Sequence, residues 1–520
     1  MIPRSLGRLA SPVSLLALSA LVACSPTAPT AAPAPPPAAA GPTGKVTIAI
    51  GAQTIASMET GRATVSASLA TIWPAFDGLT FIDDKGQVQP ALATSWRTVD
   101  DKTWEFTLGD WTFHNGRPVT LDDVLGTFRR YSDPNERLPA LALFNSVDRF
   151  DGAGKTITFT MKLVDPTFPA VIGLAMVTPI RELREQGPDE FFRKPIGSGP
   201  FRVVSTDYQI ANVYEAMGAE HRSPRGRPKV KELELRFVPE ASQRVAALQT
   251  GQVDMAAGIP TSAVRQLESA GFTIQRGAGN ATVSYLLDTR NGPTADRRVR
   301  LAINYAIDKE AIIQAIYGGS GRVDSHLLGP AALGHNASLQ PYPFDPARAR
   351  QLLAEAGYAN GFTVAMTHAT TGTTPKDLAE LVQGQLRDVG ITANVQIREL
   401  AIWTQENNND QKNAAIWMQV LNWDQTFEAQ SVYRWFSSDF TWDRGRRWED
   451  AEFDRLYQQA KTTLDREQRA RLYQQAAARL HAEAVSLFLV QPFTPSALKK
   501  GLVFPVGGSD ARYYVAMRWE

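Results

Sequence analysis

A single cysteine, Cys24, stands in 520 residues, and its surroundings indicate that its thiol is used chemically. Arg4 and Arg8 give the chain a basic start, and an apolar run covers 9–20. Residues 21–23, Leu-Val-Ala, lead directly into Cys24. This order is typical of a secretory signal, except that the cleavage site ends in cysteine. The sequence therefore predicts export, with Cys24 at the end of the cleavage site.

The segment that ends at Cys24 resembles the bacterial lipobox, whose cysteine is lipidated on sulfur and becomes the mature N-terminus. A lipidated Cys24 predicts a membrane tether, and no later segment has the roughly 18 apolar residues that a spanning helix needs. Stable anchoring takes two or more acyl chains, since each buried CH₂ contributes roughly 0.8 kcal/mol. The alternative is an ordinary signal peptide with a chance cysteine.

The stretch after Cys24 is a linker rather than part of a folded domain. Residues 25–44 contain seven prolines and no charged side chain. Such a composition buries little apolar surface and favours polyproline conformations. At about 3.1 Å per residue, the segment spans roughly 60 Å when extended. We expect a signal peptide at 1–23, a lipidated Cys24 with a Pro/Ala-rich linker at 24–44, and a globular body from 45 to 520.

The other chemistry-bearing residues form no catalytic or metal-binding pattern. The six histidines are scattered, and no two have metal-ligand spacing. A secreted hydrolase is disfavoured because the chain has no Gly-x-Ser-x-Gly elbow and no His-Glu-x-x-His pair, and Ser198 lies in Gly-Ser-Gly. The formal net charge is +1 with the two signs interspersed, which disfavours a nucleic acid partner. We predict no enzyme and no cofactor.

Strand and helix signals alternate along the body. Apolar and polar residues alternate at 104–108, 157–163 and 233–237, which predicts strands. Thr120 and Asp123 form a candidate capping box that opens a helix through Phe128. Further helices are expected at 299–307, at 345–357 between an Asp-Pro start and a closing Gly, at 383–389 and at 454–484. The mixture predicts a multidomain α/β body.

Several segments, in order, carry a family resemblance. They are Pro90–Trp96, Trp104–Leu108, Phe113–Val124, Pro195–Phe201, Arg244–Asp254, Asp296–Lys309 and Tyr342–Tyr358. Together they are similar to the extracytoplasmic solute-binding proteins of family 5, which serve peptide-type ABC importers and include dipeptide, oligopeptide and nickel binders. Leu121 departs from the pattern, because the family usually has alanine there. The resemblance covers the whole body, and any one motif alone carries little weight.

The resemblance implies a type II periplasmic-binding-protein fold with two lobes joined by two strands. Lobe one is placed at 45–81, 196–284 and 493–520, an inserted domain at 82–195, and lobe two at 285–492, with hinges near 284–287 and 490–493. A solute in the cleft gains contacts to both lobes only on closure, so binding shifts the open–closed equilibrium. We expect a monomer in the periplasm or on the outer face of the cytoplasmic membrane that delivers its ligand to a permease.

Most motif residues have simple structural explanations. Trp96, Phe113 and Phe128 are expected in the core, and His114 is expected to be a hydrogen-bonded turn residue. Gly116, Gly197 and Gly199 are expected to adopt backbone angles that other residues resist. These motifs identify the fold without locating the ligand.

Candidate ligand residues come from the resemblance and from aromatic composition. Peptide binders of the family neutralise the ligand ammonium with an Asp, and Asp424 stands in the corresponding stretch without the family's Asp-Pro pair. Six of the eleven tryptophans lie between 403 and 448, and Trp423 and Trp435 are the preferred pair for stacking on a ligand. In lobe one the candidates are Ser57, Glu59 and Thr64.

The ligand itself stays open. Between 362 and 375 there is no Arg or Lys to bind a ligand carboxylate, which disfavours a dipeptide with free termini. The first hypothesis is an importer subunit that captures a peptide or similar organic solute. A binder of nickel, haem or a metal chelate is the alternative, and a ligand-presenting receptor or chaperone is a further one.

Overall fold

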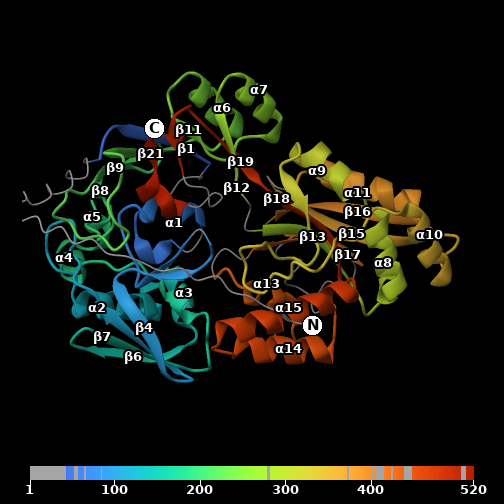
Figure 1. The fold of residues 1–520 in the computed structure, drawn as a ribbon, viewed down its shortest axis with the longest axis horizontal. Helices are drawn as coiled ribbons and strands as arrows, with labels where there is room; N and C mark the ends of the chain where they lie inside the picture. The colour runs from blue at the N-terminus through green and yellow to red at the C-terminus, as the bar shows by residue number, and fades with distance from the viewer. Residues whose placement is uncertain are drawn as a thin grey trace, which may run out of the picture. The chain divides into compact units, whose positions relative to one another are not determined.

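Three main sheets organise the described part of the chain in this computed structural model. The described residues are 42–51, 57–63, 66–83, 85–277, 281–371, 374–400, 402–403, 415–422, 426–438, 448–504 and 511–520. From Gly41 to Glu520 the chain forms one compact unit. Figure 1 shows its helices and strands.

The seven-stranded sheet is built from both ends of this unit. Its order is β12 (Thr273–Gly277), β19 (Thr494–Leu498), β11 (Met255–Ala256), β1 (Lys45–Ile50), β10 (Glu232–Phe237), β9 (Ala211–Ala216) and β8 (Phe201–Asp207). Val46 and Ile48 enter one core while Ala49 enters another, because successive side chains of a strand point to opposite faces. Helix α1 (Ser66–Ile72) contributes to the first core. Helices α6 (Ala241–Gln249) and α7 (Val264–Ser269) contribute to the second.

The six-stranded sheet is also buried on both faces. Its order is β14 (Gly321–Val323), β18 (Ser486–Pro492), β13 (Ala281–Leu287), β17 (Ile416–Asn422), β15 (Phe362–Thr370) and β16 (Ile391–Glu399). On the face of Tyr285 it packs against α8 (Arg297–Ala306), α9 (Lys309–Tyr317), α10 (Pro346–Glu355) and α11 (Lys376–Asp388). On the face of Leu286 it packs against α13 (Gln430–Tyr433), α14 (Ala451–Lys461) and α15 (Arg466–Ala482).

The third sheet has four antiparallel strands and an aromatic core. Its order is β4 (Ala93–Asp100), β5 (Thr103–Leu108), β7 (Thr156–Met161) and β6 (Val147–Ala153). Phe159 lies with its ring centroid 5.7 Å from both Phe106 and Phe128, the latter on α2 (Leu121–Ser132). Aromatic rings at such distances contribute beyond their buried area.

The chain passes twice between the two large sheets. It leaves β12 of the seven-stranded sheet and enters β13 of the six-stranded sheet, and it returns from β18 to β19 through Phe493. The backbone N–H of Phe493 donates to the carbonyl of Ser320 at 2.9 Å. The crossings therefore lie close to the segments expected as hinges.

The expected α/β fold class is confirmed, and most expected elements are present. Thr120 and Asp123 form the capping box of α2. The helix expected over 454–484 was wrong as a single element, because Asp465 caps a new helix by accepting from the N–H of Gln468 at 2.6 Å. The strand expected to reach Leu163 ends at Met161, and Leu163 is exposed.

The motif residues are structural, as expected, but two glycines have a different reason. His114 accepts from the N–H of Gly197 at 3.1 Å through Nδ1, and its Nε2 lies 3.0 Å from the carbonyl of Gly199. The expectation of special backbone angles at Gly197 and Gly199 was wrong, since neither has a positive φ. A Cβ at Gly197 would lie 1.8 Å from the carbonyl oxygen of Ala75, so close packing requires the glycine. Gly116 has the expected positive φ of 82°.

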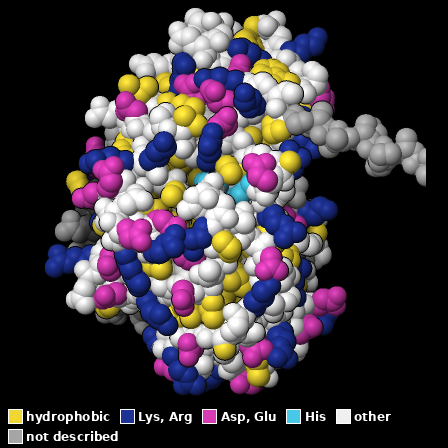
Figure 2. Space-filling model, turned by 90° about the vertical axis from the view of Figure 1, so that its left-hand side faces the viewer, with side chains coloured by type: hydrophobic (Ala, Val, Ile, Leu, Met, Phe, Trp, Pro, Cys, Tyr) yellow, Lys and Arg dark blue, Asp and Glu magenta, His cyan; other side chains and the backbone are white. Residues whose placement is uncertain are grey.

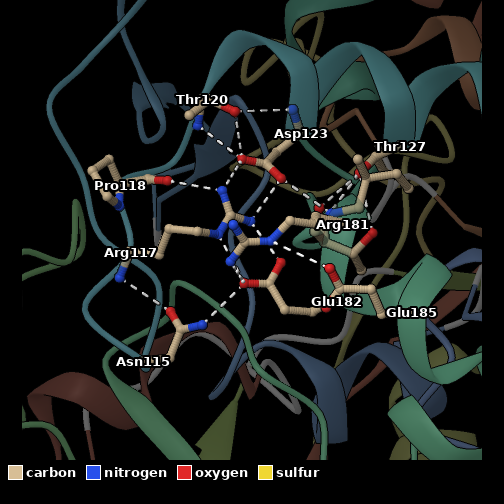
Figure 3. A network of polar contacts seen from close by, with 11 residues as sticks. Asn115, Arg117, Pro118, Thr120, Asp123, Thr127, Arg181, Glu182 and Glu185 are labelled. Carbon is tan, nitrogen blue, oxygen red and sulfur yellow. Dashed lines mark hydrogen bonds and ion pairs between the residues drawn. The ribbon is translucent and has the colours of Figure 1, made fainter.

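Arg117 holds the motif around α2 together, as Figure 3 shows. Its guanidinium donates to both carboxylate oxygens of Asp123 at 2.8 Å and to Glu182 at 2.8 and 2.9 Å. Asn115 donates to the same Glu182 at 3.1 Å. The two carboxylates raise the pKa of Arg117 above its ordinary value, chiefly through the hydrogen bond to Asp123. The network fixes the loop before α2 against α4 (Ile180–Gln186).

The surface carries no broad field of one sign where Figure 2 shows it. Lys and Arg side chains lie among Asp and Glu over that face. Within the described ranges, none of the helices combines the length and apolar composition required to cross a bilayer.

Candidate ligand site

Polar side chains are buried on one face of the six-stranded sheet, next to the two crossings. Thr282 and Ser284 of β13 are fully buried. They lie on the same face of the sheet as Leu286, because they alternate along the strand with Val283 and Tyr285, which enter the core on the other face. Gln419 occupies the same face of β17 between the core residues Trp417 and Leu421, and it is 5% exposed. Polar groups are rarely buried without hydrogen-bond partners, so the partners of these side chains have to be identified.

Asp324 is the centre of this face. Its carboxylate accepts from the hydroxyl of Thr282 at 2.6 Å and from Nε2 of Gln491 on β18 at 3.1 Å. The backbone N–H groups of His326 and Leu327 donate to it at 3.2 and 3.0 Å. Burial raises the pKa of Asp324, and these hydrogen bonds oppose that rise. One carboxylate thus joins β13, β18 and the turn after β14.

Three buried polar atoms nearby have no hydrogen-bond partner among the described residues. They are Oε1 of Gln419, Oε1 of Gln430 and the hydroxyl of Tyr433. Gln430 and Tyr433 are three residues apart on α13 and therefore project from the same side of it. Tyr433 shares its core cluster with Trp417 and Leu421 of β17. Burial, assisted by the Asp324 charge, raises the pKa of Tyr433 well above its ordinary value, so the hydroxyl stays neutral.

Two turns beside this face hold strained backbone. Leu327 has a φ of 69° and Phe427 a φ of 53°, both in the left-handed region. Non-glycine residues there cost of order 1–3 kcal/mol and cluster at ligand sites. The backbone N–H of Leu327 donates to Asp324, and the backbone N–H of Leu333 donates to the carbonyl of Phe427 at 2.7 Å. These hydrogen bonds hold Leu327 and Phe427 in their strained conformations.

A hairpin from another part of the chain covers these turns. Strands β2 (Thr80–Ile82) and β3 (Val88–Pro90) are joined by a turn that contains Gly86. A Cβ at Gly86 would lie 2.8 Å from the carbonyl oxygen of Ala331 and 2.9 Å from the ring of Phe427. Ile82 belongs to the core cluster of Leu327. The hairpin therefore packs against the turns that hold Leu327 and Phe427.

The expected ligand residues of the later half are only partly described. Trp423 and Asp424 directly follow β17 and lie outside the described residues, as do Thr64 and Cys24. Trp435 is partly buried and packs against the core cluster that contains Tyr433. The ligand role of Trp423, Asp424, Thr64 and Trp435 stays a prediction.

Glu59 and Ser57 lie close together. Ser57 Oγ accepts from the N–H of Glu59 at 3.0 Å. The buried carboxylate of Glu59 accepts from Arg62 at 2.7 Å and also forms an ion pair with Arg130 of α2. Two guanidinium groups thus neutralise Glu59, which gives it a structural role alongside the expected one.

A pocket at the start of the same hairpin holds a second buried ion pair. Arg225 donates through Nε to Asp77 at 2.6 Å and through Nη2 to the carbonyl of Phe76 at 2.9 Å. Trp73 and Ile82 also line the pocket. Arg225 and Asp324 were missed by sequence reasoning because their partners are distant in sequence, at separations of 148 and 167 residues for Asp77 and Gln491.

Histidines do not combine into a metal centre. Within the described ranges, no group of three or more His, Cys, Asp or Glu side chains has an arrangement that would hold a metal ion. The site as described offers hydrogen bonds, one buried carboxylate and aromatic surface.

Comparison with known proteins decides the family. The model of the bacterial extracellular solute-binding proteins, family 5 Middle, matches residues 87–443. The chain belongs to this family. The matched range contains Asp324 and Gln419 and ends shortly before α14.

Curated relatives and solved structures agree with that assignment. The chain is 29% identical to heme-binding protein A of Haemophilus influenzae over 83% of this chain and 84% of the relative. It is 26% identical to the nickel-binding periplasmic protein of Escherichia coli over 77% and 80% of the two chains. The structure of HbpA2 from Haemophilus parasuis matches with a TM-score of 0.81 at 23% identity, over 91% of this chain and 100% of that chain. The family 5 fold therefore extends over the described body.

Proposed function

We propose that this family 5 protein is the solute-binding lipoprotein of an ABC importer. It captures a peptide or similar organic solute and delivers it to a permease, without catalysing a reaction. The observation that carries this proposal is the buried polar face around Asp324, where atoms of Gln419, Gln430 and Tyr433 have no partner among the described residues. A solute with several hydrogen-bonding groups satisfies such atoms, whereas an apolar solute does not.

Lobes and hinges are proposed at the limits expected from the sequence. Lobe one is proposed at 45–81, 196–284 and 493–520, the inserted domain at 82–195 and lobe two at 285–492. The support is that the chain crosses between the two large sheets at the ends of β12 and β18. The hairpin at Gly86 already packs against Phe427 in this structure, and a solute that contacts both lobes favours the closed state.

Anchoring and location complete the proposal. Lipidation of Cys24 would hold the protein at the periplasmic or outer face of a membrane, as a monomer on its Pro/Ala-rich linker. A relative named as periplasmic supports the location. A nickel, haem or metal-chelate ligand is the second candidate, favoured by the names of two relatives.

Titration with defined solutes tests the ligand class. Native mass spectrometry of the full chain from its own membrane would detect a co-purifying solute. Calorimetric titration with glutathione, a tetrapeptide, haem and Ni²⁺ would then rank the classes. We expect the peptidic probes to bind with micromolar affinity, which corresponds to about −8 kcal/mol. Binding of haem or Ni²⁺ alone would establish the second candidate, and binding of none of the probes would contradict the peptide proposal.

Two tyrosine variants locate the site. Tyr433→Phe removes the unpartnered hydroxyl of the polar face, and we expect affinity for the bound probe to fall about tenfold, the effect of one hydrogen bond. Tyr473→Phe is the matched control, because Tyr473 on α15 is also fully buried with an unpartnered hydroxyl. Equal affinities of both variants and the parent would exclude this face as the ligand site.

A further inference from the structure

Three exposed cations lie together where the described chain begins. Arg227, Lys229 and Lys231 are exposed, while Pro228 and Val230 between them are buried. Lys229 and Lys231 therefore point to the same side, away from the body. Among the described residues, no carboxylate pairs with any of the three.

The same segment holds the first described residues by backbone hydrogen bonds. The N–H of Thr43 donates to the carbonyl of Lys229 at 3.0 Å, and the N–H of Lys231 donates to the carbonyl of Gly44 at 3.0 Å. The linker that starts at Cys24 thus joins the body directly beside these cations. With 18 residues between Cys24 and Thr43, the linker spans roughly 60 Å in a polyproline conformation.

An exposed tryptophan lies at the same point. Trp519 of β21 (Arg518–Trp519) donates through Nε1 to the carbonyl of Lys45 at 3.1 Å. Its ring lies 3.5 Å from the position a Cβ would take on Gly44, and it is 38% exposed. Tryptophan is enriched where proteins meet the interface of a bilayer.

Neighbouring carboxylates are neutralised within the body. Glu232 and Glu234 both contact Nζ of Lys45 at 2.6 Å. Glu520 is paired with Arg518. The neighbouring carboxylates are thus balanced by cations of the body. The positive charges of Arg227, Lys229 and Lys231 remain without an ion-pair partner among the described residues.

We propose that Arg227, Lys229, Lys231 and Trp519 form a docking surface for the anionic lipid bilayer to which Cys24 is anchored. The proposal rests on the lipidation of Cys24 proposed above. Basic side chains are attracted to anionic lipids, and a tether makes this second contact intramolecular, so a small patch suffices. The surface holds the end of the seven-stranded sheet at the membrane and limits how the body turns on its linker.

A fluorophore at the patch tests the proposal in the lipidated full chain. Because the chain has no other cysteine, Glu520→Cys carries an NBD label at one position once Cys24 is lipidated. The protein is reconstituted into phosphatidylcholine vesicles with or without one quarter phosphatidylglycerol, with a nitroxide on some headgroups. We expect nitroxide quenching to be at least about threefold stronger with phosphatidylglycerol, since each basic residue near an anionic membrane surface strengthens binding to that membrane.

Controls use a second label and two charge variants. Asn360→Cys, at an exposed turn after α10, supplies the reference label, for which we expect no dependence on phosphatidylglycerol. Changing Arg227, Lys229 and Lys231 to Glu should abolish the quenching of the label at position 520. The same change at Arg184, Arg265 and Arg387, which are exposed elsewhere, should leave it intact. Matching urea midpoints would show that both triple variants fold.

Each contrary result has a defined meaning. Quenching at position 520 that equals the reference label, or that survives the patch variant, overturns the docking surface while Cys24 stays lipidated. A protein whose Cys24 reacts with the label and has no lipid by mass spectrometry overturns the anchor itself, and the docking surface with it.

Discussion

Thr282 donates to Asp324 through a hydrogen bond of 2.6 Å that ties β13 to the turn after β14. The two residues are 42 positions apart, and both are buried. Because Asp324 also accepts from Gln491 on β18, the two strands that lead toward the crossings share one carboxylate. The two strands also pair directly in the sheet, so the carboxylate adds a side-chain link to their backbone ladder.

A double-mutant cycle measures this link. Asp324→Ala should lower the free energy of unfolding by about 3 kcal/mol, because it leaves buried donors unpaired. Thr282→Val should cost about 1.5 kcal/mol, and we expect a coupling energy of about 1.5 kcal/mol between the two sites. Urea unfolding of the parent, both single variants and the double variant gives these values. Additive effects would show that the hydrogen bond does not link the two residues energetically.

Arg244 should be among the most costly residues to replace. Its guanidinium is buried and donates at 2.6–2.7 Å to four backbone carbonyls, those of Val238, Pro239, Ala257 and Gly258. Arg244→Met keeps an unbranched apolar stem but leaves all four acceptors without their donor, so we expect a loss of about 3–5 kcal/mol in urea unfolding. Arg265→Met, at an exposed position on α7, should change stability by less than about 0.5 kcal/mol.

The network in Figure 3 predicts a similar loss for a different reason. Arg117→Met leaves Asp123 and Glu182 as neighbouring buried carboxylates without their shared cation. We expect the free energy of unfolding at pH 7 to fall by about 3–5 kcal/mol, because removing one partner leaves uncompensated buried charge. Part of the lost stability should be recovered near pH 4, where carboxylates begin to protonate. A loss that does not depend on pH would contradict the electrostatic explanation.

The buried imidazole of His326 should make the protein less stable at acidic pH. Burial lowers the pKa of His326 from 6.5 to about 3, and its Nε2 accepts from the N–H of Asn336 at 2.9 Å, a bond that protonation would break. A histidine with a lower pKa in the folded state takes up its proton on unfolding, so its contribution to stability is complete above pH 6.5 and falls as the pH drops toward 3. At pH 5 the loss amounts to about 2 kcal/mol.

The variant His326→Gln tests that prediction. Glutamine keeps an acceptor for Asn336 but does not titrate. Urea unfolding at pH 7 and pH 5 should therefore show about 2 kcal/mol less pH dependence in the variant than in the parent. An identical pH dependence in both proteins would mean that His326 is not the titrating group.

Local sequence signals predicted the elements of this fold well. The capping box of Thr120 and Asp123, the alternation at 104–108 and the Asp-Pro start at Asp345 each depend on residues within one element, so short-range chemistry is enough to identify them. The break between α14 and α15 was missed because helix-forming residues dominate on both sides of it. Only Asp465, which caps α15, marks the start of the second helix.

The candidate site depended on contacts that short-range patterns do not contain. The polar face is formed by Thr282, Asp324 and Gln491, which the fold brings together from three separate segments. Glu59 was expected at a ligand, and its partner Arg130 lies 71 residues away, so no local pattern indicates that its charge is already neutralised. Tertiary partners of buried polar groups are the information that the sequence pattern lacks.

Strand β19 has a consequence for how the polypeptide is made. It lies between β12 and β11, so the seven-stranded sheet stays in two pieces until residue 498 has been synthesised. Such a late closing strand favours slow folding, because distant segments must meet first. A chain terminated before β19 would leave the facing edges of β11 and β12 without the strand that joins them, so the sheet is completed only when translation has run close to its end.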